Sequence, residues 1–381
     1  MLAVCLSSPA ADGAAAPGAT ARPDSSATQA GIGGVHKRQL HSRLLPPRLV
    51  AGRFVFLPTI TYRSETSFGL GGELAHTYRW PGSHPDARDS DIRLRGRRTL
   101  NGHTEAELTA SVYSCRGCLS LKTKLRFTDL PLRFYGIGRD TPESNEEVYR
   151  PQSLLYYVEV LHPLAPHLRL GLRYEIENQG LRRVESGGLL ATDAIRGTEK
   201  GRAAGAGLLA DWDTRDHRYA PRHGMYHQVF ALVFDEALGS DYDFNNYNLD
   251  LRWYDAIGSA GVLATQLFCY AARGQPPFWR LAALGGRAHS RGYRRGRYLD
   301  HVLVAGQLEF RTPLYHRLGL AVFGGLADVA PAPSRLRLAD VRPTVGGGLR
   351  VRVASSGLRA RLDVAAGAEG VELDFGLGEA F

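Results

Sequence analysis

The sequence predicts an all-β protein: a transmembrane antiparallel β-barrel of about sixteen strands, with a long sixth outer loop folded into its interior. Apolar and polar residues alternate with a period of two from residue 54 onward, as expected when one strand face meets lipid and the other a polar lumen. A Gly- and Arg-rich segment, 284–298, leads directly into one such alternating segment, 302–314. The last alternating segment closes on an aromatic residue, Phe381.

The first fifty residues differ from the rest, and we interpret 1–50 as a leader and 51–381 as the barrel. Met1–Leu6 resembles the end of a secretory signal peptide whose start is missing, because no basic residue precedes its short apolar run. Residues 7–45 are rich in Ala, Gly, Ser, Pro and Thr, a composition typical of disordered chain.

Alternating segments supply the strands of the barrel. In 119–127 the odd positions are apolar or Thr and the even positions are polar, and 247–253 alternates in the same way. Charges lie on the polar face of nearly every strand, and Tyr, Trp and Phe end the apolar face, which favours a membrane barrel over a soluble sandwich. The predicted strands are 54–63, 67–79, 91–100, 104–114, 119–128, 153–162, 168–178, 203–213, 224–235, 243–255, 261–273, 301–312, 317–327, 341–354, 357–367 and 370–381.

The connections between these strands differ in length in a regular way. Those at 129–152, 179–202, 274–300 and 328–340 are long, and the turns near 163–166, 257–259 and 355–357 are short. If the chain starts on the periplasmic side, every long connection falls on the outer side of the membrane. This sorting is typical of outer-membrane barrels.

The basic character of the chain does not indicate nucleic-acid binding. The net charge is +9, and 43 of the 47 basic residues are arginine, spread along strands and loops beside Asp and Glu. Because no segment concentrates them, we expect a lumen and rim lined with paired charges. A lesser alternative is that rim arginines meet the phosphates of outer-leaflet lipid.

Covalent chemistry, a metal and a cofactor are not predicted. Cys115 and Cys118 form a lone C-x-x-C between two strand-like segments, which we interpret as a tight turn that a local disulfide would close in an oxidising compartment. Cys5 and Cys269 are interpreted as structural. The sequence has no Gly-Lys phosphate loop and no G-x-S-x-G, and His162, His167 and His289 lie in turns or loops, so we do not expect an enzyme.

Four segments carry a resemblance to a known family. They are 57–72, then 134–138 with Asp140, then 211–216 with Pro221 and Gly224, and finally Arg291-Gly292-Tyr293. In this order, residues 54–381 resemble the barrel domain of the BamA/TamA outer-membrane assembly family, the bacterial surface antigens. The resemblance implies that Arg291 lies in the sixth outer loop, which folds back into the lumen.

The resemblance also implies a lock between that loop and the barrel wall, in which Arg291, Gly292 and Tyr293 meet acids on the following strands. Glu309, beside Arg311, matches one acidic position and lies on the polar face of its strand. The second acid usually follows a phenylalanine by two residues. Here Phe323 is followed by two glycines, and the nearest acid is Asp328. The alternative is that the loop only plugs the barrel.

The C-terminal segment resembles the signal that the barrel assembly machinery reads during biogenesis. Gly376 and Phe381 stand at the expected positions, and Glu379 stands where an apolar residue is usual. We therefore expect the bacterial outer membrane as the location of the protein.

Two classes of function remain open on this sequence. The first is insertion or translocation of client outer-membrane proteins through a weak seam between the first and last strands. The second is a passive or structural barrel plugged by its own loop. The leader is expected to be too short for the periplasmic domains that assembly factors carry. A long hydrogen-bonded seam would favour the passive barrel.

Overall fold

The computed structural model describes residues 53–63, 67–79, 89–113, 119–192, 194–286, 288–353 and 359–381. All of them belong to one compact unit that begins at Pro46. The expected leader and three of the cysteines, Cys5, Cys115 and Cys118, lie outside the described residues. Cys269 is a half-buried free thiol.

In the described part of the chain, sixteen long strands form the wall, as predicted, and three short strands lie in the connections. The long strands are β1 (Arg53–Arg63), β2 (Ser67–Tyr78), β3 (Ser90–Thr99), β4 (Thr104–Tyr113), β5 (Ser120–Asp129), β7 (Glu147–Ala165), β8 (Leu168–Arg183), β9 (Gly201–Asp213), β10 (Gly224–Phe234), β11 (Phe244–Ile257), β12 (Gly261–Gly274), β15 (Val302–Tyr315), β16 (Leu318–Ala330), β17 (Arg342–Arg352), β18 (Arg359–Gly367) and β19 (Gly370–Leu377). The short strands are β6 (Leu132–Phe134), β13 (Ala282–Leu284) and β14 (Tyr298–Asp300).

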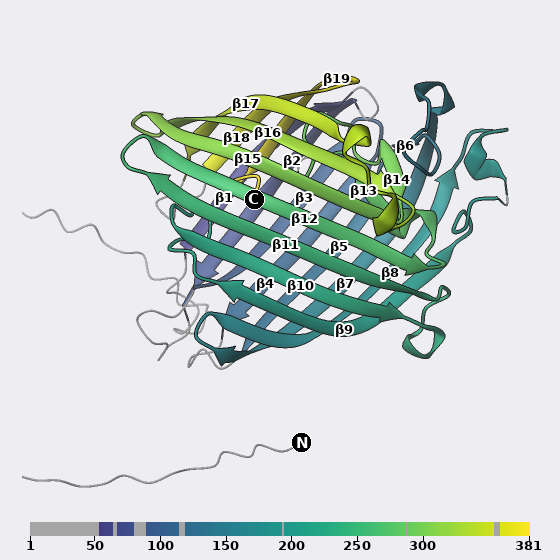
Figure 1. The fold of residues 1–381 in the computed structure, drawn as a ribbon, viewed down its shortest axis with the longest axis horizontal. Helices are drawn as coiled ribbons and strands as arrows, with labels where there is room; N and C mark the ends of the chain where they lie inside the picture. The colour runs from purple at the N-terminus through teal and green to yellow at the C-terminus, as the bar shows by residue number, and fades with distance from the viewer. Residues whose placement is uncertain are drawn as a thin grey trace, which may run out of the picture. The chain divides into compact units, whose positions relative to one another are not determined.

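The wall is an antiparallel meander in which each long strand pairs with the next one along the chain (Figure 1). The short strands are bypassed, so β5 pairs with β7 and β12 with β15. The ladders are long: β11 and β12 pair from Phe244–Gly274 to Ile257–Gly261. Among the described residues, no ladder joins β1 to β19.

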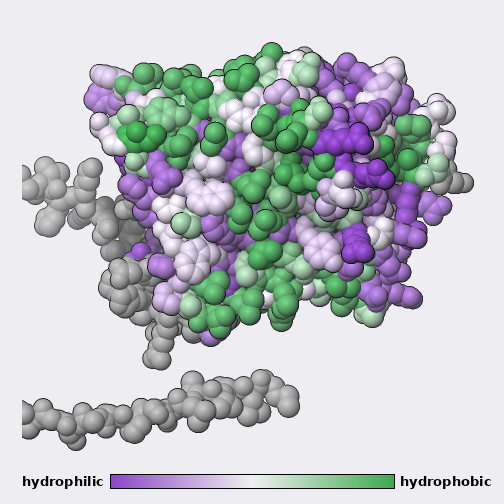
Figure 2. All heavy atoms as spheres, viewed as in Figure 1, coloured by the Kyte–Doolittle hydropathy of each residue, from purple (hydrophilic) through white to green (hydrophobic). Residues whose placement is uncertain are grey.

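The two faces of the wall differ as the alternation predicts. On β15, Leu308 is 53% exposed on the outer face, and its neighbour Glu309 is fully buried on the inner face. On β19, Val371, Leu373 and Phe375 are exposed apolar side chains. Such residues recur over the strands of the face shown in Figure 2, with more polar residues gathered toward the ends. An outer surface of this kind is what a lipid-facing barrel requires.

No helix in the described part of the chain is both long enough and apolar enough to cross a membrane.

The four long connections lie at one end of the barrel, because successive connections of an antiparallel meander alternate between ends. Counted at that end, the connection between β12 and β15 is the sixth, and we call it the sixth loop. The strands at this end extend beyond the predicted limits. For example, β7 begins at Glu147 rather than 153, and β8 continues to Arg183 rather than 178. Backbone pairing continues there into polar sequence, where apolar alternation no longer marks a strand.

Candidate loop-anchoring site in the lumen

The sixth loop leaves β12 and folds back on itself as a small ribbon. Strands β13 and β14 pair, and the segment between them is closed by backbone hydrogen bonds. The amide of Gly286 donates to the carbonyl of Tyr293 at 2.9 Å, and the amide of Gly296 donates to Leu284 at 3.1 Å. The hydroxyl of Ser290 accepts from the amide of Gly285 at 2.7 Å. The turn therefore holds its own shape and presents Arg291 at its tip.

Arg291 points into a closed ring of four charges in the lumen. Its Nη1 lies 2.6 Å from Glu309 Oε2 on β15 and 3.0 Å from Asp363 Oδ2 on β18. Arg350, on β17 between them, pairs with Asp363 and lies 3.2 Å from the other Glu309 oxygen. We call these four side chains the charge ring. Positive and negative charges alternate around it, so each buried charge has two opposite neighbours, which offsets the cost of removing it from water.

Neutral side chains also contact the guanidinium of Arg291. The guanidinium of Arg291 lies over the ring of Phe323 on β16, 3.4 Å from its centroid. Its Nη2 donates to the side chain of Gln307 at 3.1 Å, and Gln307 in turn donates to the loop carbonyl of Ala288 at 2.7 Å. The side chain of Arg291 is only 2% exposed, so these contacts form in a site from which water is largely excluded.

The residue after the arginine must be glycine. Gly292 has a φ of +97°, and a Cβ there would lie 2.8 Å from the backbone of Ala366 at the end of β18. A Cβ on Gly367 would in turn lie 2.7 Å from the carbonyl of Gly292 and 2.9 Å from the ring of Tyr293. The loop backbone and the β18–β19 turn are therefore in direct contact.

Tyr293 attaches the sixth loop to the barrel by apolar packing and two hydrogen bonds. Its ring is buried in an apolar cluster with Phe268, Leu303 and Val329. Its hydroxyl donates to the carbonyl of Pro343 at 3.3 Å and accepts from the amide of Ala368 at 3.2 Å.

The connection between β5 and β7, residues 130–146, is the third loop at this end, and we call it the third outer loop; it contacts the sixth loop. The amide of Gly138 donates to the carbonyl of Leu299 at 2.6 Å. Arg297 pairs with Glu369 at 2.7 Å and donates to the hydroxyl of Thr141 at 3.1 Å. Beside this contact, rings of Phe134, Tyr149 and Phe278 pack edge to face. The outer end of the lumen is therefore covered by packed loops.

His289 lies beside the charge ring without belonging to it. Its imidazole stacks on the ring of Phe268 with centroids 3.6 Å apart, and its buried Nδ1 has no hydrogen-bond partner among the described residues. Burial lowers the pKa of the His289 imidazole to about 4, because the hydration that the charged form would lose outweighs its attraction to Asp250.

Below the ring, a second group of charges continues toward the end of the barrel that carries the short turns. Arg311 Nε lies 2.8 Å from Glu309 and 3.6 Å from Glu379. Glu379 also forms ion pairs with Arg350 at 2.9 Å and with Arg359 at 2.7 Å. Among the described residues, no group of three or more His, Cys, Asp or Glu side chains has the arrangement of a metal site.

The structure brings together five of the six residues proposed for the lock: Arg291, Gly292, Tyr293, Glu309 and Arg311. Asp328 is elsewhere. Its ion pairs are with Arg139 at 3.3 Å and Arg342 at 3.6 Å.

The reason that Asp328 misses Arg291 is the register of the strand. Glu309 faces Phe323 across the β15–β16 ladder, and Asp328 lies five positions farther along. Five residues of strand span about 16 Å, and an odd number of steps reverses the side of the sheet. The second acid is instead Asp363, which the sequence analysis missed. The pattern that could have identified Asp363 is the placement of Arg361 and Asp363 on the polar face of one predicted strand.

The two residues of the proposed C-terminal signal lie in different surroundings. Gly376 faces Arg361, and a Cβ there would come within 3.1 Å of the guanidinium. Phe381 is turned inward. Its ring is buried against Tyr254, Val262 and Ala264, and its carbonyl accepts from Arg311 at 3.1 Å.

Comparison with known proteins identifies a family and several structures that this chain resembles. The Omp85 superfamily domain matches residues 104–381. BamA from Haemophilus ducreyi lacking POTRA domains 1–3 is similar in structure, with a TM-score of 0.56 and 15% identity over 86% of this chain and 69% of that one. CdiB from Acinetobacter baumannii has a TM-score of 0.51 and 10% identity over 86% and 59% of the two chains. CdiB from Escherichia coli has a TM-score of 0.52 and 11% identity over 87% and 62%. No curated protein matches the sequence.

Proposed function

We propose, because the chain belongs to the Omp85 superfamily, that this barrel assists the insertion or translocation of client proteins at the bacterial outer membrane. Its partners would be outer-membrane lipid and the unfolded client strands. In this proposal the protein performs no covalent chemistry. The chain works by holding open, or opening, a hydrogen-bonding edge inside the membrane.

The observation that carries the proposal is the seam between the first and last strands. Every other pair of neighbouring long strands is joined by a ladder, and the shortest ladders, β3–β4, β17–β18 and β18–β19, each have eight pairs. No such ladder joins β1 to β19 among the described residues. Unpaired backbone groups cannot be satisfied by lipid, so an open strand edge at this depth favours pairing with another strand.

The lumen offers a poor alternative route. The charge ring anchors the sixth loop inside the barrel, and the third outer loop covers it. A client passing through the lumen would have to break these contacts. A client entering at the seam would leave them in place.

The seam can be tested with tethers. Pairs of cysteines joining β1 (at Phe54 or Phe56) to β19 (at Leu373 or Phe375) are introduced into a background whose native cysteines are serine. The protein is placed in phospholipid vesicles, and the folding rate of a small outer-membrane barrel client is measured with the disulfide closed and reduced. We expect vesicles with the reduced protein to accelerate client folding and closure of the tether to remove the acceleration.

The matched control ties two strands that are already paired. Leu349 and Leu362 lie opposite each other on β17 and β18 and are both exposed on the outer face. A disulfide between cysteines at these positions should leave the acceleration unchanged. Equal activity of the seam-tethered and untethered protein would contradict the seam mechanism.

The second candidate is a passive barrel plugged by its own loop, which the burial of Arg291 in the lumen favours. It predicts no acceleration of client folding in any variant. It also predicts that Arg291→Gln, by loosening the loop, raises ion conductance in planar bilayers. The two candidates are therefore separated by the client-folding assay on the unaltered chain.

A further inference from the structure

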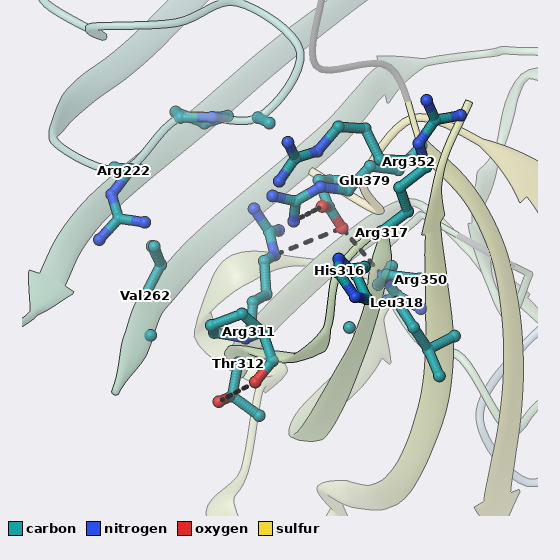
Figure 3. A pocket seen from close by; sticks show the side chains of 16 residues that line it. Arg222, Val262, Arg311, Thr312, His316, Arg317, Leu318, Arg350, Arg352 and Glu379 are labelled. Atoms are coloured by element: carbon teal, nitrogen blue, oxygen red, sulfur yellow. Dashed lines mark hydrogen bonds and ion pairs between the residues drawn. The ribbon is translucent and has the colours of Figure 1, made fainter. Parts of the chain in front are cut away.

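A small cavity at the end of the barrel with the short turns has arginine as its commonest lining residue (Figure 3). It lies where β10 and β12 begin, where β15 turns into β16, and where β17 ends. Six arginines contribute to its walls: Arg222, Arg311, Arg317, Arg350, Arg352 and Arg359. Among the described residues of the lining, Glu379 is the only acid.

The single carboxylate satisfies only half of these arginines. Glu379 pairs with Arg350, Arg359 and, more loosely, Arg311. Within the described part of the chain, the guanidinium of Arg222 donates only to the carbonyl of Gly258, at 3.4 Å.

Two more arginines of the lining have no acid. Arg317, in the β15–β16 turn, and Arg352, at the end of β17, have no side-chain ion pair with any described residue. Three exposed guanidinium groups around one cavity therefore have no acidic partner among the described residues.

One side chain of the lining, Arg311, has a buried donor atom that is not satisfied by any described residue. Its side chain is only 4% exposed, yet its Nη1 has no hydrogen-bond partner among the described residues. A buried donor without a partner destabilises the folded chain, and a charged donor does so more than a neutral one. Arg311 lines the cavity, and Figure 3 shows its guanidinium directed toward Glu379. An acceptor in the cavity would satisfy this donor.

We propose that this cavity is a binding site for a phosphate group. Guanidinium groups bind phosphate oxygens with paired hydrogen bonds, and a dianion suits the uncompensated charge of Arg222, Arg317 and Arg352 better than another monocarboxylate does. The cavity volume is about 90 Å³. Because one water needs roughly 10–15 Å³ by the same measure, a tetrahedral oxyanion fits. The phosphate comes either from a soluble phosphate ester or from a lipid headgroup at the membrane surface.

The site does not depend on the insertion function. It predicts opposite effects for two kinds of variant. Loss of Arg317 and Arg352 weakens binding, since both supply charge to the ligand. Loss of the Glu379 charge strengthens binding, because that carboxylate competes for Arg311, Arg350 and Arg359 and repels an incoming anion.

The test is isothermal titration of pyrophosphate into the full chain in non-ionic detergent and phosphate-free buffer. We expect binding to the unaltered protein, at least tenfold weaker binding to the Arg317→Gln/Arg352→Gln double variant, and tighter binding to Glu379→Gln. The Arg182→Gln/Arg294→Gln double variant is the matched control. It removes two exposed arginines from the other end of the barrel and should bind as the unaltered chain does. A heat-dependent shift in gel mobility confirms that each variant is folded.

Short-chain phosphatidic acid in mixed micelles separates the two sources. Competition between it and pyrophosphate supports one shared phosphate site. Binding of the lipid alone, lost in the Arg317→Gln/Arg352→Gln variant, assigns the site to a headgroup. Absence of binding by either probe, or equal binding by the double variant, overturns the proposal. An acidic peptide that competes as well as pyrophosphate also overturns it, because the ligand would then be a protein segment.

Discussion

Replacing Glu309 by glutamine removes the acid that three arginines share. Its carboxylate is fully buried and lies 2.6 Å from Arg291, 2.8 Å from Arg311 and 3.2 Å from Arg350. Glutamine keeps the shape and some hydrogen bonds but loses the charge. The comparison of interest is with Arg291→Gln, which removes one of its partners.

The ion-pair partners that remain predict which substitution costs more. After Arg291→Gln, Glu309 still pairs with Arg311 and Arg350. After Glu309→Gln, three arginines lose an acid at once, and among the described residues Arg311 keeps an ion pair only with Glu379, at 3.6 Å. Glu309→Gln therefore leaves buried positive charge poorly compensated, whereas Arg291→Gln leaves Glu309 with two partners.

The magnitudes follow from that difference. Leaving buried charges uncompensated costs about 3–5 kcal/mol, which we expect for Glu309→Gln. Losing charged hydrogen bonds while the acids keep other arginines costs about 1.5–3 kcal/mol, which we expect for Arg291→Gln. Glu309→Gln should thus be the more destabilising substitution by about 2 kcal/mol.

The assay is urea unfolding from phospholipid vesicles, followed by tryptophan fluorescence. With a slope of about 1–3 kcal/mol per molar urea, a difference of about 2 kcal/mol separates the two midpoints by roughly 1 M. Glu372→Gln is the control, because Glu372 is 42% exposed and pairs with an exposed arginine, so its loss should cost under about 0.5 kcal/mol. Equal or greater destabilisation by Arg291→Gln would refute this reasoning.

Three further substitutions test other contacts. Gly292→Ala should make the sixth loop more sensitive to trypsin, because the added Cβ would meet the backbone of Ala366. Gly296 also has a positive φ but lies in open space, so Gly296→Ala should increase cleavage less. Equal cleavage would show that the contact is unimportant. The pKa of His289 is about 4 in the folded chain and 6.5 in the unfolded chain. The contribution of neutral His289 to the free energy of unfolding is therefore fully present above pH 6.5 and is lost as the pH falls from 6.5 to 4, by about 3 kcal/mol. His289→Phe should flatten this pH dependence in urea titrations, and an unchanged slope would contradict the assignment. Phe381→Ser should lower the heat-modifiable protein in outer-membrane fractions and Phe381→Leu should restore it if apolar packing is the cause, whereas normal levels of the serine variant would exclude both packing and signal roles.

The wall of the barrel could be predicted because its determinant is local. A period of two is visible within nine residues, so segments such as 119–127 reveal both faces of a strand without any partner. Register between strands is not local in this sense. The choice of Asp328 failed because the sequence does not show that this residue lies five positions beyond the level of Glu309.

The C-terminal segment illustrates the same limit at a turn. Phe381 was expected to end the last strand, but β19 ends at Leu377 and Gly378 turns the chain with a φ of +83°. The ring then packs inside on residues of β11 and β12. Alternation indicates which side of a strand a residue occupies and carries no information once the strand has ended.

The charge ring also imposes an order on the assembly of the barrel. Arg291 and Glu309 are 18 residues apart, whereas Arg291 and Asp363 are 72 apart. Wall strands pair with their immediate neighbours, but the ring closes only after β17 and β18 have joined the wall. Contacts between distant parts of a chain form late because their loop-closure entropy must be overcome first. Settling of the sixth loop would therefore report that the C-terminal strands are in place, and a barrel that lacked them would keep its lumen open.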